Sequence, residues 1–189
     1  MYLQMRKNLK IKTKLGLEFT LEVPEIEEAG RNILPVQLFN LSDHDEVINV
    51  EEVEGIDYFE LNIGINEKGK LKAYKTVKED LLKVKTNSLS ELMIFTNIGN
   101  VYKIPVFLMK KLMEEEVSVE TFVGALDKKE KVVTLMSVNS YEEDTVVYLF
   151  SKKGMVKKTL LKEFEGDVLK QACYKFKFED DEVVAADIN

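Results

Sequence analysis

The chain has 189 residues, of which 45% are hydrophobic and 32% charged, a composition typical of a globular protein with a sizeable core. No stretch approaches the roughly 20 apolar residues that a membrane-spanning helix needs, and the first ten residues lack the apolar segment of a secretory signal. The single cysteine, Cys173, excludes an intramolecular disulfide. We therefore expect a cytoplasmic protein with no membrane partner, in which Cys173 is a small core residue on a strand.

The first feature along the chain is a strand–turn–strand pattern that recurs four times, with a glycine at each corner: Gly16, Gly69, Gly99 and Gly154. The two clearest copies read IFTNIGNVYKIPVFLM (94–109) and LFSKKGMVKKTLLKEF (149–164), and their glycines are 55 positions apart. Glycine suits these corners because tight hairpin turns often need a positive φ. A repeat of this length predicts a propeller-like array of small sheets.

A second kind of segment follows three of these hairpins, over residues 36–50, 119–135 and 171–188. Each is predicted to contain a strand, an acidic turn and a Val- or Ile-rich strand. A complete unit would then be two hairpins, or about four strands, which is one blade. Between Gly69 and Gly99 the unit is shortened, and the sequence permits a short helix at 77–82 and another at 110–116.

The predicted fold class is therefore all-β, with about four blades of short antiparallel strands. No Pro-, Ser- or Gly-rich linker divides the chain, so residues 1–189 are predicted to form one domain. The expected approximate blades are residues 1–53, 54–88, 89–138 and 139–189.

Charge is segregated along the chain, although the net charge is −7. Twenty of the 27 bases lie in four segments, residues 6–14, 68–85, 92–111 and 152–162, and the connections between them are mostly acidic. Because a polyanion responds to the local field, such hairpins could form a basic surface for nucleic acid. An equally weighted interpretation is that the lysines only protect exposed strand edges from pairing.

The hairpins resemble those of the C-terminal domain of bacterial type II topoisomerase A subunits, the family that comprises the A subunits of DNA gyrase and of topoisomerase IV. Thr96–Lys103 and Ser151–Thr159 carry the resemblance, each with a T-x-x-G-like corner, an apolar residue and one or two bases. The resemblance implies a β-pinwheel, a propeller-like disc whose blades exchange strands and whose basic rim bends DNA. It also implies three partners in a nucleoid-associated complex: double-stranded DNA, the rest of the A subunit and the ATPase B subunit. The domain would be linked to the B subunit through the rest of the A subunit.

One departure concerns the type of A subunit. Gyrase A subunits carry a Gln-Arg-Arg-Gly-Gly-Lys-Gly box in the first blade, and none of the three glutamines here has that context. The resemblance therefore favours the topoisomerase IV type, with a gyrase wrapping domain as an alternative.

No catalytic constellation is visible. The only histidine, His44, lies in an acidic turn, and none of the seven tyrosines follows an arginine as the family's strand-cleaving tyrosine does. We expect a non-catalytic domain with no metal site and no cofactor, whose parent protein resembles an ATP-dependent topoisomerase. A stand-alone enzyme is the least favoured interpretation.

The predicted function is to bind and bend DNA through sequence-independent phosphate contacts, and so to position duplex DNA for strand passage. The acidic connections are expected to keep DNA away from the other faces. An alternative, favoured by the net charge, is a propeller module that binds protein and not DNA. The candidate DNA-binding residues are the bases of the hairpins: Arg6, Lys7, Lys10, Lys12, Lys14, Lys68, Lys70, Lys72, Lys75, Lys103, Lys152, Lys153, Lys157, Lys158 and Lys162.

Overall fold

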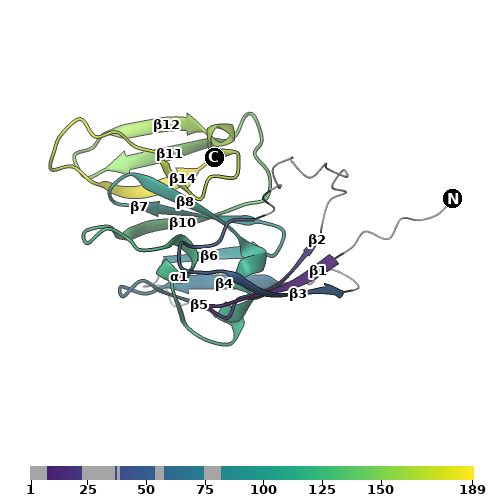
Figure 1. Cartoon of the computed structure of the whole chain (residues 1–189). Coiled ribbons are helices and arrows are strands. Elements are labelled where there is room, and N and C mark those ends of the chain that lie inside the picture. The colour runs from purple at the N-terminus through teal and green to yellow at the C-terminus, as the bar shows by residue number, and fades with distance from the viewer. Residues whose placement is uncertain (1–7, 23–36, 38, 54–57, 75–81) are drawn as a thin grey trace, which may run out of the picture.

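The residues that the structure describes form four small antiparallel sheets, which we number I to IV along the chain (Figure 1). The computed structural model describes residues 8–22, 37, 39–53, 58–74 and 82–189. Sheet I has the strand order β2-β1-β3, sheet II β6-β4-β5-β9, sheet III β10-β7-β8-β13 and sheet IV β12-β11-β14. The predicted all-β, propeller-like fold class is confirmed.

The strands are short, with two to seven residues each. In chain order they are β1 Asn8–Thr13, β2 Glu18–Glu22, β3 Val47–Val53, β4 Glu60–Ile65, β5 Lys70–Ala73, β6 Leu82–Asn87, β7 Glu91–Thr96, β8 Asn100–Pro105, β9 Val117–Ser118, β10 Val132–Val138, β11 Val146–Ser151, β12 Val156–Leu160, β13 Lys170–Ala172 and β14 Val183–Ile188. Three short helices join them: η1 Val106–Met113, α1 Glu120–Val123 and η2 Leu161–Phe164.

The same three-strand unit recurs in every sheet. Two strands form a hairpin across the glycine corner, and in sheets I, III and IV the strand that follows the acidic turn returns to pair with the first strand. In sheet III, for example, Ile94 pairs with Tyr102 on one side and with Leu135 on the other. The glycine-cornered hairpins predicted from the alternating pattern are therefore present.

Neighbouring units exchange strands. β9 follows the hairpin of sheet III, yet it pairs with β5 of sheet II, where Leu71 lies opposite Val117. β13 follows the hairpin of sheet IV, yet it pairs with β8 of sheet III, where Val101 lies opposite Gln171. This exchange is the property that distinguishes a β-pinwheel from a simple row of blades.

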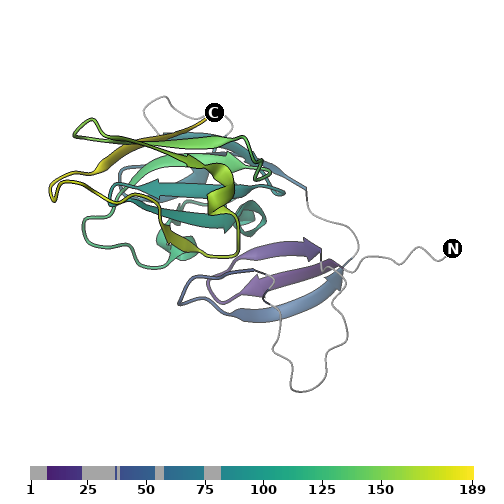
Figure 2. The ribbon, with the colours of Figure 1, turned by 90° about the horizontal axis from the view of Figure 1, so that it is seen from above.

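Sheet III is buried on both faces because it lies between two other sheets. Leu92 and Ile94 point into one hydrophobic cluster, and Met93 and Phe95 into another. The sheets also share polar contacts: the hydroxyls of Ser137 on β10 and Thr86 on β6 lie 2.8 Å apart. Sheets II, III and IV form a stack, and sheet I lies to one side of it (Figure 2), with β2 packed on η1.

The segments around the acidic turns differ from the prediction. Instead of a strand at the start of 119–135, the chain forms α1, because the buried residues Val119, Phe122 and Val123 have the i, i+3, i+4 spacing of a helix. Residues 39–42 form no strand. The helix predicted at 110–116 begins earlier, as η1, and the one predicted at 77–82 lies mostly outside the described residues.

The glycine corners lead to the first prediction, a comparison of Gly99→Ala with Gly154→Ala. Both glycines have φ near +80°, so an alanine should cost about 1–2 kcal/mol at either site. At Gly99 a Cβ would also lie 2.8 Å from the carbonyl oxygen of Tyr174, whereas at Gly154 it would meet nothing within 4 Å. Overpacking should add about 1–3 kcal/mol to the loss at Gly99. Urea unfolding measures both, and equal losses would contradict the packing argument.

Candidate nucleic-acid interface

The four corners share one hydrogen-bonding frame. The first residue of each corner is Thr, Asn or Ser, and its side-chain oxygen accepts the backbone N–H of the residue four positions later. These bonds are Leu17 to Thr13 (3.2 Å), Lys70 to Asn66 (3.0 Å), Asn100 to Thr96 (3.3 Å) and Met155 to Ser151 (3.3 Å). The frame therefore gives the four corners the same local hydrogen bond to the backbone.

The acidic turns dock directly on three of these corners. The N–H of the second corner residue donates to the carbonyl oxygen of the residue that leads into the returning strand. The pairs are Lys14 with Glu46 (2.9 Å), Asn97 with Lys131 (2.9 Å) and Lys152 with Glu182 (2.8 Å). The acids of these turns therefore lie beside the corners and not on separate faces of the domain.

A carboxylate completes each of these docked corners. Asp181 accepts the hydroxyl of Ser151 at 2.6 Å and the N–H of Lys153 at 3.0 Å. Asp45 accepts the N–H of Leu15 at 2.9 Å. Burial raises the pKa of Asp181, but hydrogen bonds from Ser151, Lys153 and Glu182 outweigh it and leave the pKa below its ordinary value. The acidic residues are thus part of the corner and are not merely solvated surface.

The corner lysines are paired with these and other acids. Hydrogen bonds to Glu46 and Glu182 raise the pKa values of Lys14 and Lys152. The ion pairs of the predicted site lysines, on the corners and next to them, are Lys10–Glu18 (3.7 Å), Lys12–Glu18 (2.9 Å), Lys14–Glu46 (2.9 Å), Lys152–Glu182 (2.9 Å), Lys153–Asp180 and Lys162–Glu143 (2.5 Å). Such exposed pairs contribute about 0–1 kcal/mol each, but they cancel charge locally.

One predicted DNA-binding residue, Lys103, is not on the surface. Its side chain is buried, and its ammonium group donates to the carbonyl oxygens of Phe164 and Gly166. It also lies 5.7 Å from the centre of the Tyr141 ring. Because the chain that leads into β13 covers it, Lys103 holds the exchanged strand in place and leaves the candidate set.

The clearest basic surface lies on sheet II. Lys70 and Lys72 on β5 share a face with Lys83 and Lys85 on β6, as the register through β4 shows. Gly64 stands between Lys72 and Lys83 in one row and contributes no side chain. We call these four lysines the sheet II lysine face. Lys83 and Lys85 were not among the predicted site residues, although their alternation in KVKT placed them on one face of a strand.

The remaining predicted residues are dispersed. Lys68 is exposed on the sheet II corner. Lys157 and Lys158 are exposed on β12, where the ammonium group of Lys157 donates to the carbonyl oxygen of Cys173 at 2.8 Å. Within the described part of the chain, no ion pair is formed by Lys157 or Lys158, or by Lys70, Lys72 or Lys83. The ammonium group of Lys85 lies 3.6 Å from the carboxylate of Glu60. Arg6, Lys7 and Lys75 lie outside the described residues.

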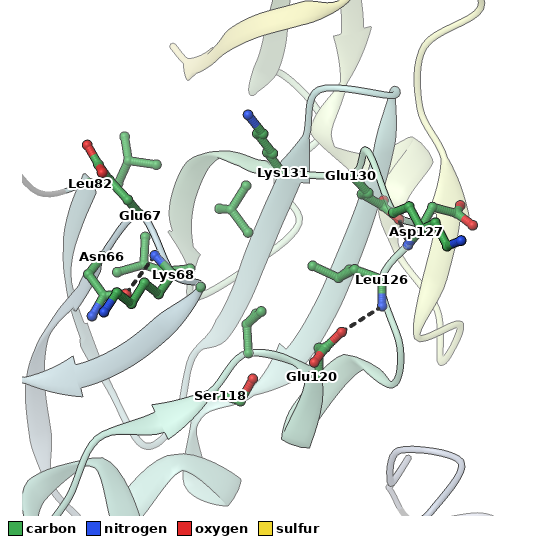
Figure 3. A pocket seen from close by; sticks show the side chains of 15 residues that line it. Asn66, Glu67, Lys68, Leu82, Ser118, Glu120, Leu126, Asp127, Glu130 and Lys131 are labelled. Carbon is green, nitrogen blue, oxygen red and sulfur yellow. Dashed lines mark hydrogen bonds between the residues drawn. The ribbon is translucent and has the colours of Figure 1, made fainter.

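A cavity of about 790 Å³ opens between the sheet II corner and the chain that leads into β10 (Figure 3). The Leu126 N–H donates to Glu120 at 3.3 Å on one wall. Its lining mixes acids with lysines, since Glu67, Glu120, Asp127 and Glu130 accompany Lys68, Lys128 and Lys131. The cavity therefore has no excess of positive charge and is a poor site for a phosphate.

The described residues include no group of three or more His, Cys, Asp or Glu placed to hold a metal ion. His44 is exposed in its turn. Cys173 is buried beside β13, and burial raises the pKa of its thiol to about 11, as expected for a core residue and not for a nucleophile. Across the ranges that the structure describes, no helix is long and apolar enough to cross a membrane.

Comparison with known families finds a match to the model described as DNA gyrase C-terminal domain, beta-propeller, over residues 90–107 and 145–165. These residues contain the hairpins of sheets III and IV. The DNA gyrase A subunit of Metamycoplasma arthritidis (strain 158L3-1) is 30% identical over 95 residues, which cover 48% of this chain and 11% of that protein. The chain therefore spans a small part of this relative.

Among solved structures, a C-terminal domain of DNA topoisomerase IV matches 71% of this chain and 47% of its own, with a TM-score of 0.57 and 20% identity. A DNA gyrase A C-terminal domain matches 95% of this chain and 64% of its own, with a TM-score of 0.44 and 18% identity. The topoisomerase IV match shows the same fold. Together with the family match at the two hairpins, it confirms the resemblance inferred from the sequence.

The second prediction concerns the carboxylate of the sheet III corner, Glu130. It is buried, and it accepts hydrogen bonds from Thr96 (2.8 Å), Asn100 (2.9 Å) and Tyr102 (3.2 Å). Burial raises its pKa, but the hydrogen bonds from Asn100, Thr96 and Asp127 outweigh burial and bring the pKa below the ordinary 4.5. The charged form therefore stabilises the fold above pH 4.5, and this contribution is lost as the pH falls through the lowered value.

We accordingly expect Glu130→Gln to lower the free energy of unfolding at pH 7 by about 1–3 kcal/mol. Stability of the variant should also fall less steeply than that of the parent chain as the pH drops below 4.5. Chemical unfolding at several pH values measures both effects. Glu163→Gln, at an exposed position, is the control and should change stability by about 0.5 kcal/mol or less. An unchanged pH dependence in Glu130→Gln would contradict the assignment.

Proposed function

We propose that the chain is a non-catalytic domain that binds and bends duplex DNA. In this proposal it belongs to the A subunit of a topoisomerase IV-like enzyme and positions DNA for strand passage that the ATPase B subunit drives. The enzyme would act on the nucleoid in the cytoplasm. The observation that carries the proposal is the sheet II lysine face, on a fold like that of the topoisomerase IV C-terminal domain.

The spacing of these lysines suits a nucleic-acid backbone. Residues two apart on a strand are about 6.6–6.8 Å apart. This distance equals the axial rise of about two nucleotides of one DNA strand, at about 3.4 Å per phosphate. Lys83 and Lys85 are such a pair, and so are Lys70 and Lys72. The two pairs flank β4, so they lie about two strand spacings, or about 9.5 Å, apart. Four ammonium groups could thus follow several phosphates without reading a base.

The third prediction compares two variants that remove the same charge. The first replaces Lys70, Lys72, Lys83 and Lys85 by Gln, and the second replaces the ion-paired Lys14, Lys152, Lys153 and Lys162 by Gln. The first should weaken DNA binding roughly tenfold or more at low salt and reduce the slope of log K against log salt by about 0.9 for each phosphate that the variant no longer binds. The second should have the smaller effect, because carboxylates already neutralise its lysines.

Gel-shift titrations over a salt series measure both variants, with unfolding curves as the control for structure. Equal losses would mean that only total charge matters. A larger loss in the ion-paired set would move the proposed interface to the corners.

The fourth prediction concerns the length of the bound duplex. If DNA follows one curved face, affinity should rise with duplex length until the face is fully occupied and should then become constant. Bending should also bring the ends of a labelled duplex closer together, which energy transfer between two dyes measures. Binding without a change in end-to-end distance would retain the DNA partner and reject bending.

The docked acids favour a second function, a module that binds protein and has no use for DNA. Three acids meet two lysines at the sheet IV corner, where Asp180, Asp181 and Glu182 face Lys152 and Lys153. A surface of mixed sign suits a protein partner of complementary charges better than it suits a polyanion. No retardation of duplex DNA at low salt would favour this function over the first.

A further inference from the structure

The outer edge of β12 could pair with a further strand, and no described strand pairs with it. In sheets II and III the strand that follows the glycine corner, β5 or β8, is paired on its outer side by β9 or β13. In sheet IV the corresponding strand is β12, and it stands at the end of the order β12-β11-β14. The same element is therefore covered by a strand in sheets II and III, and among the described residues it has no outer strand in sheets I and IV. In sheet I this element, β2, is packed on η1, which leaves β12 as the candidate edge.

The equivalence holds atom by atom at the two filled sites. Val119, next to β9, donates its N–H to the carbonyl of Gly69 at 2.9 Å. Cys173, next to β13, donates its N–H to the carbonyl of Gly99 at 2.8 Å. A Cβ added to Gly69 would lie 3.6 Å from Val119, and one added to Gly99 would lie 2.8 Å from Tyr174. A Cβ added to Gly154 would have no atom within 4 Å. The space that β9 and β13 fill at the other two corners is therefore not filled by any described residue in sheet IV.

Exposure of the edge agrees with this assignment. Leu71 and Val101, two residues after the glycines of sheets II and III, are both 0% exposed. Their counterpart Val156 is 57% exposed, and Leu160 at the end of β12 is 46% exposed. A bare strand edge with exposed apolar side chains is a template for another strand.

The polar groups of the edge point outward as well. Ser151 donates its N–H to Met155, and Leu161 donates to Thr145, so the odd-numbered residues of β12 face β11. The N–H groups of Val156 and Lys158 therefore point away from sheet IV. Lys158 corresponds to Lys103 in sheet III. The N–H of Lys103 donates to the carbonyl oxygen of Leu169, next to β13, and its ammonium group donates to the carbonyl oxygen of Phe164.

We propose that β12 binds an extended, uncharged or acidic segment of a partner polypeptide, which adds to sheet IV as an antiparallel strand. The segment places a small apolar residue beside Gly154, as Val119 and Cys173 do beside their glycines. Its preceding carbonyls cap Lys158. This interaction is separate from the DNA contacts of the sheet II lysine face.

The charges on β12 decide between occupants. Pairing of β12 with a second copy of itself would bring Lys157 and Lys158 of both copies together, and like charges across a strand pair are destabilising. An acidic strand complements them. β9 already has this character, since its flanking sequence EEEVSVET carries four acids and no base.

The test uses the full chain and a labelled peptide of sequence EEEVSVET, residues 114–121. We expect saturable binding by fluorescence anisotropy, and at least a tenfold loss when proline replaces the residue corresponding to Val119, because proline has no N–H to donate to Gly154. Amide exchange followed by NMR supplies the location. The amides of Val156 and Lys158 should exchange at least tenfold more slowly with peptide, and those of Lys157 and Thr159 should be unchanged.

Three results would overturn the proposal. The first is no binding of the peptide together with unchanged exchange at Val156 and Lys158. The second is slower exchange of these two amides with duplex DNA and not with peptide. The third is their protection at high protein concentration alone, which would make a second copy the occupant.

Discussion

The interaction on which the rest of the structure depends is the docking of the acidic turn on the glycine corner. A corner exposes backbone N–H groups that cannot all be satisfied within a hairpin, and a buried or half-buried N–H needs an acceptor. In sheets I, III and IV the residue that leads into the returning strand supplies a carbonyl, and the residue before that one supplies a carboxylate. The returning strand is thereby held beside the first strand of the hairpin.

This docking has an electrostatic consequence. Because the docked turns bring acids to the corners, a lysine placed there lies beside a counter-charge: Lys14 pairs with Glu46, and Lys152 pairs with Glu182. The corners are therefore close to neutral or acidic, and a free basic field has to come from strand faces. Sheet II presents such a face because both β5 and β6 alternate lysine with apolar residues.

Strand exchange imposes a second constraint. A unit that lends its strand to the previous sheet cannot cover its own outer edge, so sheets II and III each depend on the next sheet along the chain. The segment that leads into β13 covers the outer edge of β8 and buries Lys103. The ammonium group of this lysine, which would be exposed on an isolated hairpin, donates to the carbonyl oxygens of Phe164 and Gly166. Among the described residues no strand pairs with the outer edge of β12, whose apolar side chains Val156 and Leu160 stay exposed.

Local residue patterns were enough to predict the hairpins, because the hydrogen bonds of a hairpin join residues that are close together in the sequence. The positions of Gly16, Gly69, Gly99 and Gly154, the alternation in the flanking strands and the spacing of the repeats predicted the hairpins and the propeller-like fold class. These features follow from backbone geometry at short range, which the order of residues encodes directly.

Only the tertiary structure decided which hairpin receives which strand and which lysine keeps its charge exposed. Lys103 and Lys158 occupy the same place in their repeats, yet one is buried and the other is on the surface. The difference arises from segments about 60 residues away along the chain, at Phe164 and Gly166. Pairings at such separation depend on the packing of whole sheets, so no local pattern around either lysine contains them.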